Sequence, residues 1–340
     1  MMPGDDAAQI DAVITWVDGG DPVHRRNLEA LLASQGGVRP KTALPTRFND
    51  AGELEYCLAS ILRYAPWFRT IHIVTGGQRP ALLAQLEGTQ WAGRVRLVDH
   101  REVFSGYSQY LPTFNSRAII TALWRIPGLA ERFVYFNDDF MLLQPVVPED
   151  FFRGDAPVLR GKWMTQAGHR WGRRLIQALR SLRRGHGGVD RAASHDAQER
   201  AARLAGFERR YYRMYHNPYP MRRATLAAFF ERHPDMLEAN LRERLRSSSQ
   251  FKTECLAAHL EIAQGRMVQD NQCYVIQLKP SNQSAFRVAA KLARADSDPN
   301  AAFICVQSLE LAPEPVRTRI VDWLTRRIGS LDQVLESGNL

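Results

Sequence analysis

The fold is decided by residues 10–22, which read IDAVITWVDGGDP. The run from Ile10 to Val17 is almost continuously apolar, as in a strand buried on both faces of a parallel sheet. It ends in the polar cluster Asp18-Gly19-Gly20-Asp21-Pro22, where a turn and a new helix are expected. Ligands bind beyond the carboxyl ends of strands in open parallel sheets, so this cluster is the first candidate site.

Further strand and helix patterns alternate with this strand. Strands are predicted at Thr70–Thr75, Arg94–Val98 and Arg132–Phe136. Helical patterns lie between them at Val23–Ser34, Gly52–Tyr64, Pro80–Leu86 and Asn115–Trp124. Strands that alternate with helices form right-handed βαβ units, so we expect an α/β fold with a Rossmann-like, mainly parallel sheet.

After Phe152 the pattern becomes mainly helical. Helices are predicted at Met221–Arg232, Leu237–Arg246, Thr253–Ala263 and Pro315–Gly329. Two short runs, Met267–Gln277 and Ala302–Val306, are predicted to return to the sheet edge. We expect four regions: an α/β core (8–152), which the motifs described below suggest binds a nucleotide sugar, a basic, partly helical insertion (153–214), a helical region (215–312) that would contact the acceptor and complete the site, and a C-terminal helix (313–340).

Composition excludes several protein classes. The chain has 340 residues, 45% hydrophobic and 24% charged, which is typical of globular proteins. No apolar run approaches the ~20 residues needed to span a bilayer, and the N-terminus lacks the apolar segment of a secretory signal. The four cysteines are far apart and form no CxxC pair, which argues against a zinc ribbon or a disulfide framework. We therefore expect a cytoplasmic protein.

The positive charge is concentrated in one segment. Arg160 to Arg213 contains 14 Lys and Arg against 4 Asp and Glu, whereas the whole chain has a net charge of +9. This uneven distribution is unlike that of a nucleic-acid-binding protein, and no nucleic-acid partner is expected. Within it, Arg170–Arg184 has the pattern of a basic amphipathic helix. It either lies peripherally on the anionic inner face of the cell membrane or packs its leucine stripe on the domain.

A second acidic cluster, Asn137-Asp138-Asp139, follows the strand Arg132–Phe136. It would share the edge of the sheet with the cluster after the first strand. Adjacent carboxylates repel each other unless a cation or base is near, and Mg²⁺ prefers carboxylate and amide oxygens. The sequence therefore predicts Mg²⁺ or Mn²⁺ at Asp138 and Asp139. The structural alternatives are a turn at this triplet and a helix N-cap at Asp21.

Two further motifs are candidates for phosphate chemistry. Thr75-Gly76-Gly77-Gln78 ends a strand, where glycines can let backbone amides approach a phosphate or ribose, or can form a plain turn. His216 lies in a proline-rich stretch ahead of Arg222 and Arg223, which predicts a rigid loop leading into a helix. A histidine held there suits acid–base work near phosphates, although a lone histidine is often structural.

Together these motifs resemble the conserved regions of the Stealth family of sugar-phosphate transferases. Residues 10–22 resemble the first region, and residues 53–80 with 114–139 resemble the second. His216 to Arg223 resembles the third region, and Arg246 falls where that region's later arginine is expected. One departure is that Cys305 is followed by Gln307-Ser308, where the family's fourth region reads Asn-Asp. The resemblance leaves open whether this departure alters metal or acceptor binding.

The resemblance implies a GT-A-like fold and a reaction in capsular or exopolysaccharide synthesis. A hexose or N-acetylhexosamine 1-phosphate would pass from a UDP-sugar to a hydroxyl of a growing polysaccharide or lipid-linked sugar, releasing UMP. His216 would be the base, with Asp18 as its alternative. Charge on the phosphate would be taken up by Arg117, Arg222 and Arg223. The residues implied in substrate binding are Trp16, Gly19, Asp21, Gln78, Asn115, Asn137 and Arg246.

Two other functions fit the same residues. A glycosyltransferase could use the same fold and metal but attack the anomeric carbon and release UDP. A non-catalytic protein could use the basic segment to bind a membrane or polymer. The nucleotide that is released, UMP, UDP or neither, distinguishes the three functions.

Overall fold

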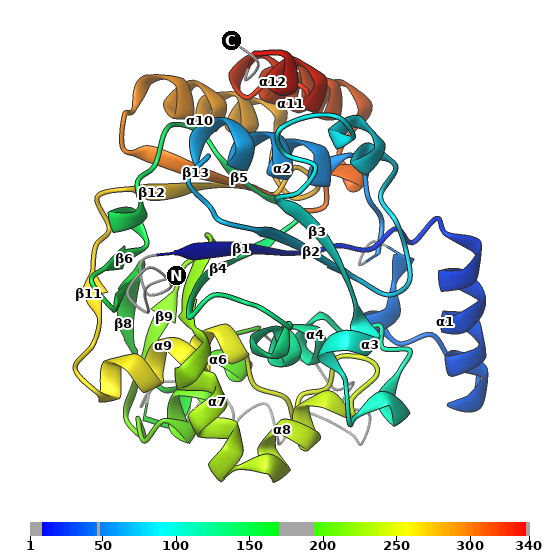
Figure 1. Ribbon diagram of the computed structural model, residues 1–340, viewed down its shortest axis with the longest axis vertical. Helices are drawn as coiled ribbons and strands as arrows, with labels where there is room; N and C mark the ends of the chain where they lie inside the picture. The colour runs from blue at the N-terminus through cyan, green and yellow to red at the C-terminus, as the bar shows by residue number, and fades with distance from the viewer. Residues whose placement is uncertain (1–8, 46–47, 170–193, 338–340) are drawn as a thin grey trace.

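The computed structural model describes residues 9–45, 48–169 and 194–337 (Figure 1). Its central layer is a five-stranded sheet in the order β10-β4-β1-β2-β3. The parallel strands are β1 (Ile10–Thr15), β2 (Ile71–Thr75), β3 (Val95–Asp99) and β4 (Arg132–Asn137). Strand β10 (Tyr219–Arg222) pairs antiparallel with β4 at the edge. This sheet confirms the mainly parallel α/β fold predicted from the alternating pattern.

Strand β1 is buried in the middle of the sheet, as its apolar sequence predicts. Ala12, Val13 and Ile14 are fully buried. The charged residue in β1, Asp11, is also buried, and it accepts hydrogen bonds from Arg69, His72 and the backbone N–H of Ala130. These bonds compensate the carboxylate for the loss of water and tie the amino ends of β1, β2 and β4 together.

The strand register brings four chain segments to one edge of the sheet. Thr15 is paired with Val74 on one side and Asn137 on the other, and Thr75 is paired with Asp99. The segments that follow β1, β2, β3 and β4 therefore leave the sheet together. This is the edge at which the acidic clusters were predicted to meet.

Helices cover both faces of the central sheet. In Figure 1, α2, α10, α11 and α12 lie above it, and α3, α4 and α6 to α9 lie below it. The upper helices are α2 (Glu53–Tyr64), α10 (Ala285–Ser297), α11 (Glu314–Arg327) and α12 (Leu331–Ser337). The others are α1 (Pro22–Ser34), α3 (His100–Val103), α4 (Ser116–Ala122), α6 (Ser194–Leu204), α7 (Arg223–Arg232), α8 (Pro234–Leu241) and α9 (Thr253–Ala263).

A second sheet begins immediately after the acidic pair. Its order is β12-β13-β5, formed by β5 (Phe140–Leu142), β12 (Tyr274–Leu278) and β13 (Ala301–Val306). Because β5 follows β4 directly, Asp138 and Asp139 lie in the step between the two sheets. The backbone N–H of Val306 donates to the carbonyl oxygen of Asp139 at 3.0 Å, so the end of β13 borders this step. Smaller strands complete the fold: β6 (Phe152–Arg153), β7 (Ala156–Leu159), β8 (Gly161–Thr165), β9 (Arg210–Met214) and β11 (Val268–Gln269).

Two predicted helices differ from the structure. The prediction of a helix from Met221 was wrong, because residues 219–222 form β10 and α7 starts at Arg223. Pro220 made this stretch read as a loop, but proline is tolerated in an edge strand, where β10 lies. The segment Ala81–Leu86 is a 3-10 helix rather than an α-helix.

One large hydrophobic cluster includes residues from all four predicted regions. Most of the buried hydrophobic residues, from Ile10 to Leu335, belong to this cluster, and a smaller second cluster includes Leu28, Phe48 and Phe114. The boundaries of the four regions stay a prediction. Within the described residues, no helix has both the length and the apolar character needed to cross a membrane. The predicted basic helix Arg170–Arg184 lies outside the described residues.

Candidate active site

A cavity of about 1100 Å³ opens at the carboxyl edge of the parallel strands. It collects most of the residues predicted for the site: Trp16, Asp21, Gln78, Arg117, Asn137, Asp138, Asp139, His216 and Arg246. The predicted residues that do not line it are Asp18, Gly19, Asn115, Arg222 and Arg223. The cavity also has lining residues that the sequence did not single out, among them Glu53, His100, Lys252, Glu254 and Lys279.

The acidic pair forms one side of this cavity. Burial raises the pKa of Asp138 well above its usual range, and Asp139, Glu53 and Asp50 raise it further by repulsion. Burial also raises the pKa of Asp139 to about 6, although a hydrogen bond from Cys305 opposes the shift. Oδ1 of Asp139 is buried and has no hydrogen-bond partner among the described residues. Two desolvated, mutually repelling carboxylates with a free oxygen fit a divalent cation such as Mg²⁺ or Mn²⁺.

Glu53 extends the acidic side and was missed in the sequence. It is the first residue of α2, is 6% exposed, and accepts a hydrogen bond from the backbone N–H of Ala51 at 2.6 Å. Burial raises its pKa to about 7, with added repulsion from Asp50 and Glu310. Trp16 lies beside this group, since its Nε1 donates to Oδ2 of Asp50 at 2.7 Å. Helix α2 thus contributes a third carboxyl group near the acidic pair.

His216 faces cations. Burial lowers its pKa to about 3, and Lys252, Lys279 and Arg246 lower it further by repulsion. All three of these cations line the cavity. The sequence had instead suggested Arg222 and Arg223 as the cations near His216.

The ring of His216 is held in a fixed position. Its Nδ1 lies 3.2 Å from the hydroxyl oxygen of Tyr219. Its ring meets the edge of Phe140 with 4.9 Å between centroids. The ligand atoms of Asp139, His216 and Cys305 all lie within 4.8 Å of one another. The histidine is therefore next to Asp139 and shares the cavity with the three cations.

Arg222 and Arg223 lie at the other end of β4, and the structure does not bring them to the cavity. The antiparallel register pairs Tyr219 with Tyr135 but pairs Arg222 with Arg132, the first residue of β4. Arg222 forms an ion pair with Glu131 at 3.2 Å. Strand β10 runs away from the carboxyl edge, so arginines close to His216 in sequence are carried away from it.

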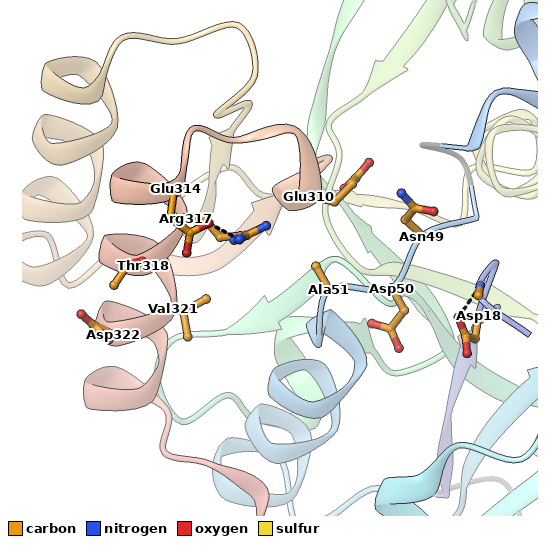
Figure 2. Close-up of a pocket in the computed structure, with 11 residues that line it drawn as sticks. Asp18, Asn49, Asp50, Ala51, Glu310, Glu314, Arg317, Thr318, Val321 and Asp322 are labelled. Carbon is orange, nitrogen blue, oxygen red and sulfur yellow. Dashed lines mark hydrogen bonds and ion pairs between the residues drawn. The ribbon is translucent and has the colours of Figure 1, made fainter.

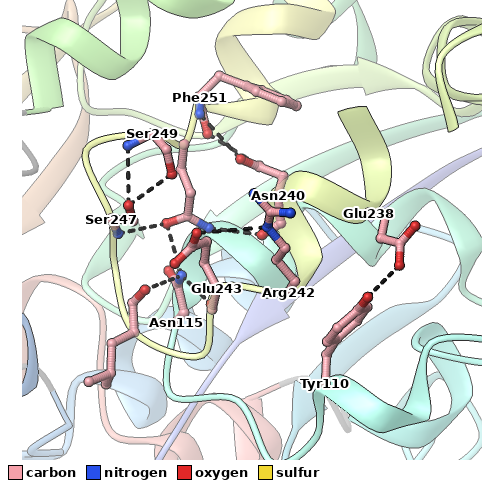
Figure 3. Close-up of polar contacts among 11 residues, drawn as sticks. Tyr110, Asn115, Glu238, Asn240, Arg242, Glu243, Ser247, Ser249 and Phe251 are labelled. Carbon is pink, nitrogen blue, oxygen red and sulfur yellow. Dashed lines mark hydrogen bonds and ion pairs between the residues drawn. The ribbon is translucent and has the colours of Figure 1, made fainter. Parts of the chain in front are cut away.

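Asn115 supports the site without lining it. It caps α4, and its Oδ1 accepts from the backbone N–H of Arg117 at 3.1 Å. Its Nδ2 donates to the carbonyl oxygens of Glu243 and Leu245 at 2.6 and 3.0 Å (Figure 3). Nη1 of Arg117 donates to the carbonyl oxygen of Ser247 at 2.9 Å. These bonds fasten residues 243–247 to α4 and so place Arg246 in the cavity.

Gln78 links the segments that follow β1 and β2. Its side chain accepts from the backbone N–H of Asp18 at 3.0 Å and donates to the Asp18 carbonyl oxygen at 2.7 Å. Asp21 caps α1 by accepting from the N–H of His24 at 2.7 Å, as its structural interpretation predicted. Gly19 permits a close approach, because a Cβ there would lie 2.7 Å from the carbonyl oxygen of Phe48. These residues shape the cavity wall.

Asp18 faces an adjoining acidic cavity of about 600 Å³. Its Oδ1 accepts from the N–H of Gly20 at 2.7 Å. Figure 2 shows the lining side chains coming from the turn after β1, the segment before α2, the 3-10 helix Leu309–Leu311 and helix α11. Asn49 and Glu310 line both cavities, so the two adjoin at these residues.

The part of the main cavity that is lined by His24, Phe48, His100, Thr113 and Phe114, called the far lobe below, contains unpartnered polar groups. His100 and Thr113 are 8% and 6% exposed, and His100 Nε2 and Thr113 Oγ1 have no hydrogen-bond partner among the described residues. Burial lowers the pKa of His100 to about 4, so its ring is neutral. His24 packs there against Phe48 and Phe114, with centroids 5.2 and 5.1 Å away. This lobe offers aromatic surface and free hydrogen-bonding atoms.

Comparison with solved structures gives distant similarities. The galactosyltransferase LgtC in complex with donor and acceptor sugar analogs aligns over 93% of this chain and 96% of its own, with 13% identity and a TM-score of 0.41. The glycosyltransferase GlyE of Streptococcus pneumoniae aligns over 97% of this chain and 63% of its own, with 9% identity and a TM-score of 0.42.

Sequence relatives match less than half of the chain. It is 44% identical over 151 residues to the exopolysaccharide phosphotransferase SCO6023 of Streptomyces coelicolor, covering 44% of this chain and 24% of that protein. It is 37% identical over 153 residues to the capsular polysaccharide phosphotransferase cps12A of Actinobacillus pleuropneumoniae, covering 44% and 39%. It is 35% identical over 148 residues to the receptor polysaccharide phosphotransferase WefC of Streptococcus oralis, covering 44% and 42%. The matches thus span less than half the length of each of these relatives.

Two family models match the chain between residues 8 and 158. Conserved region 1 of the Stealth proteins matches residues 8–36. Conserved region 2 matches residues 47–158, which include the acidic pair Asp138 and Asp139. The turn after β1, helix α2 and the step from β4 to β5 all lie in the regions that are similar to these two Stealth models.

Proposed function

We propose that this protein transfers a sugar 1-phosphate. The donor is a UDP-hexose or UDP-N-acetylhexosamine, and the acceptor is a hydroxyl of a polysaccharide or lipid-linked sugar in capsular or exopolysaccharide synthesis. The products are a sugar phosphodiester and UMP. The observation that carries the proposal is the position of His216, whose ring lies within 4.8 Å of Asp139 and is also close enough to Lys252, Lys279 and Arg246 for their charges to lower its pKa. The names of the sequence relatives support the same class of reaction.

The donor fits the cavity with its diphosphate near the acidic pair. A divalent cation held by Asp138 and Asp139 would neutralise part of the diphosphate charge. Lys252, Lys279 and Arg246 face the same space and would bind phosphate oxygens directly. Phosphate binding would thus use both sides of the cavity.

The nucleoside fits the far lobe. Strand β3 lies three strands from β4, which at about 4.8 Å per strand is about 14 Å. That separation suits a nucleoside whose diphosphate is at Asp138 and whose base reaches His100 at the end of β3. The unpartnered Nε2 of His100 and Oγ1 of Thr113 would then bind polar atoms of the base.

His216 is the base in this proposal. Its ring is neutral in the free protein, because burial and the nearby cations lower its pKa to about 3. If Nδ1–H donates to Tyr219, Nε2 has a free lone pair. Nε2 takes the proton from the acceptor hydroxyl as its oxygen attacks the β-phosphorus. The bond from that phosphorus to the bridging oxygen breaks, UMP leaves, and the cations stabilise the negative charge.

The adjoining acidic cavity suits the acceptor. It is lined by Asp18, Asp50, Glu310 and Glu314, whose carboxylates can accept hydrogen bonds from sugar hydroxyls. Since Asn49 and Glu310 border both cavities, an acceptor there can present a hydroxyl toward the donor. Contact of Arg170–Arg184 with an anionic membrane, which would deliver a lipid-linked acceptor, stays a prediction.

The nucleotide product tests this proposal. Purified protein is incubated with each UDP-sugar, Mg²⁺ and an oligosaccharide acceptor, and the nucleotides are separated by anion exchange. We expect acceptor-dependent release of UMP. Release of UDP would show glycosyl transfer, and release of neither nucleotide across the donor panel would favour a binding protein.

A further inference from the structure

We propose that Asp139, His216 and Cys305 form a site for Zn²⁺ or a similar thiophilic divalent cation. The three residues come from the step after β4, the segment before β10 and strand β13. Their ligand atoms all lie within 4.8 Å of one another. A carboxylate, an imidazole and a thiol from three distant parts of the chain thus meet at one point.

The distances are close to those of a bound zinc ion. Sγ of Cys305 lies 3.5 Å from Oδ2 of Asp139. Zinc bonds of about 2.0–2.3 Å in a tetrahedron place ligand atoms about 3.3–3.8 Å apart. Shifts of about 1 Å or less would therefore bring the three ligand atoms onto one ion. Oδ1 of Asp139, which has no hydrogen-bond partner among the described residues, shows that this carboxylate is not already saturated.

The mixture of donor atoms selects the kind of metal. Mg²⁺ takes oxygen ligands and keeps several waters, so it suits the carboxylates of Asp138 and Asp139. Sulfur and nitrogen ligands favour zinc and similar ions. Three protein ligands leave a fourth position for water, as in zinc sites that are not purely structural.

The local charges allow the site but weaken it. Zinc would replace the proton on Sγ of Cys305, which passes to solvent, and the resulting thiolate with Asp139 would balance the two charges of the ion. Asp138 and Glu53 also favour a cation nearby, whereas Lys252 and Lys279 on the His216 side oppose it. We therefore expect reversible binding, weaker than in a four-ligand structural zinc site.

Zinc at this site would inhibit transfer. The ion would occupy the imidazole lone pair with which His216 accepts the acceptor's proton, so inhibition should persist in excess Mg²⁺. This consequence rests on the proposed function, whereas metal binding does not. Binding is therefore measured without substrate.

X-ray absorption on the zinc-loaded wild-type chain tests the ligand set without any mutation. We expect one sulfur at about 2.3 Å and nitrogen or oxygen neighbours at about 2.0–2.1 Å. A shell with oxygen and nitrogen only, or with more than one sulfur, would overturn the site.

Cobalt binding to variants identifies the sulfur. Co²⁺ bound to the wild type should give a thiolate charge-transfer band that zinc displaces. Cys305→Ser should lose the band and bind zinc roughly 100-fold more weakly. Cys273→Ser is the matched control, because Cys273 is also a free cysteine but does not belong to the Asp139, His216 and Cys305 cluster, and this variant should keep both the band and the zinc affinity. Equal loss in both variants, or a band that survives Cys305→Ser in folded protein, would contradict the proposal. If these results hold but no UMP is released, the proposed function fails and the metal site stands.

Discussion

Nδ1 of His216 lies 3.2 Å from the hydroxyl oxygen of Tyr219, the first residue of β10. Burial raises the pKa of Tyr219 well above its usual range, so the phenol stays protonated. Its ring is stacked on Tyr135 with 6.1 Å between centroids, which fixes the hydroxyl in place. Tyr219 is therefore a positioning residue that sets which nitrogen of His216 faces the acceptor.

Tyr219→Phe tests this positioning role. The variant keeps the buried ring but removes one hydrogen bond worth about 1 kcal/mol, so we expect kcat to fall about 5-fold. KM for the UDP-sugar should change little, since Tyr219 does not line the cavity. An unchanged kcat in a variant with wild-type melting temperature would show that the hydrogen bond does not orient the base.

His216→Gln tests the base itself. A glutamine can hydrogen-bond the acceptor hydroxyl but cannot take its proton, so kcat should fall by roughly 10²–10⁴. In the wild type the pKa of about 3 keeps the free imidazole neutral, so kcat/KM should show no break from His216 above about pH 5. The bound diphosphate favours the imidazolium, so the break in kcat should lie at higher pH than the break in kcat/KM. A folded His216→Gln variant with near wild-type kcat would transfer the role to another group, Asp18 first.

Asp138→Asn separates activity from stability. The folded protein raises the pKa of Asp138, so its ionised form costs stability at neutral pH when no cation is bound. The variant should melt about 2 °C higher than wild type in chelator. It should lose several orders of magnitude in turnover with Mg²⁺ present, as should wild type in excess EDTA. Full turnover in EDTA, or a lower melting point for the metal-free variant, would contradict the cation assignment.

Lys279 and Arg223 are both exposed cations, so Lys279→Ala and Arg223→Ala form a matched pair of variants. Lys279 lines the cavity and Arg223 lies at the far end of β4. Removing Lys279 should lower kcat/KM about 10-fold, the usual size of one charge-assisted hydrogen bond. Removing Arg223 should leave kcat/KM unchanged within about 2-fold. The reverse order would restore the role that the sequence assigned to Arg223.

The position of the site at the carboxyl edge of the parallel sheet could be predicted, because it depends on sequence patterns within single strands. The buried runs of β1 and β4 and their polar ends are visible in the sequence, and parallel strands must present their carboxyl ends together. Glu53 could have been found by the same reasoning. A helix that leads into a parallel strand starts at the carboxyl edge, so the first residue of α2 lies there.

The cations could not be predicted, because tertiary structure brings them in. Lys252 precedes α9 and Lys279 follows β12, and neither position has a local pattern that points to His216. Arg222 was wrongly expected at the site, because it is close to His216 in sequence but not in the folded chain. It lies three residues after Tyr219 in an extended strand, which at about 3.3 Å per residue carries it about 10 Å from the site.

The fate of the β-phosphorus tests the central claim most directly. A UDP-sugar labelled with radioactive phosphorus at the β position is incubated with protein, Mg²⁺ and acceptor, and acceptor and nucleotide are then separated. Sugar 1-phosphate transfer predicts that the label appears in the acceptor, in equal amount to the sugar, and that the UMP formed is unlabelled. Label that stays in UDP while unlabelled sugar enters the acceptor would contradict it.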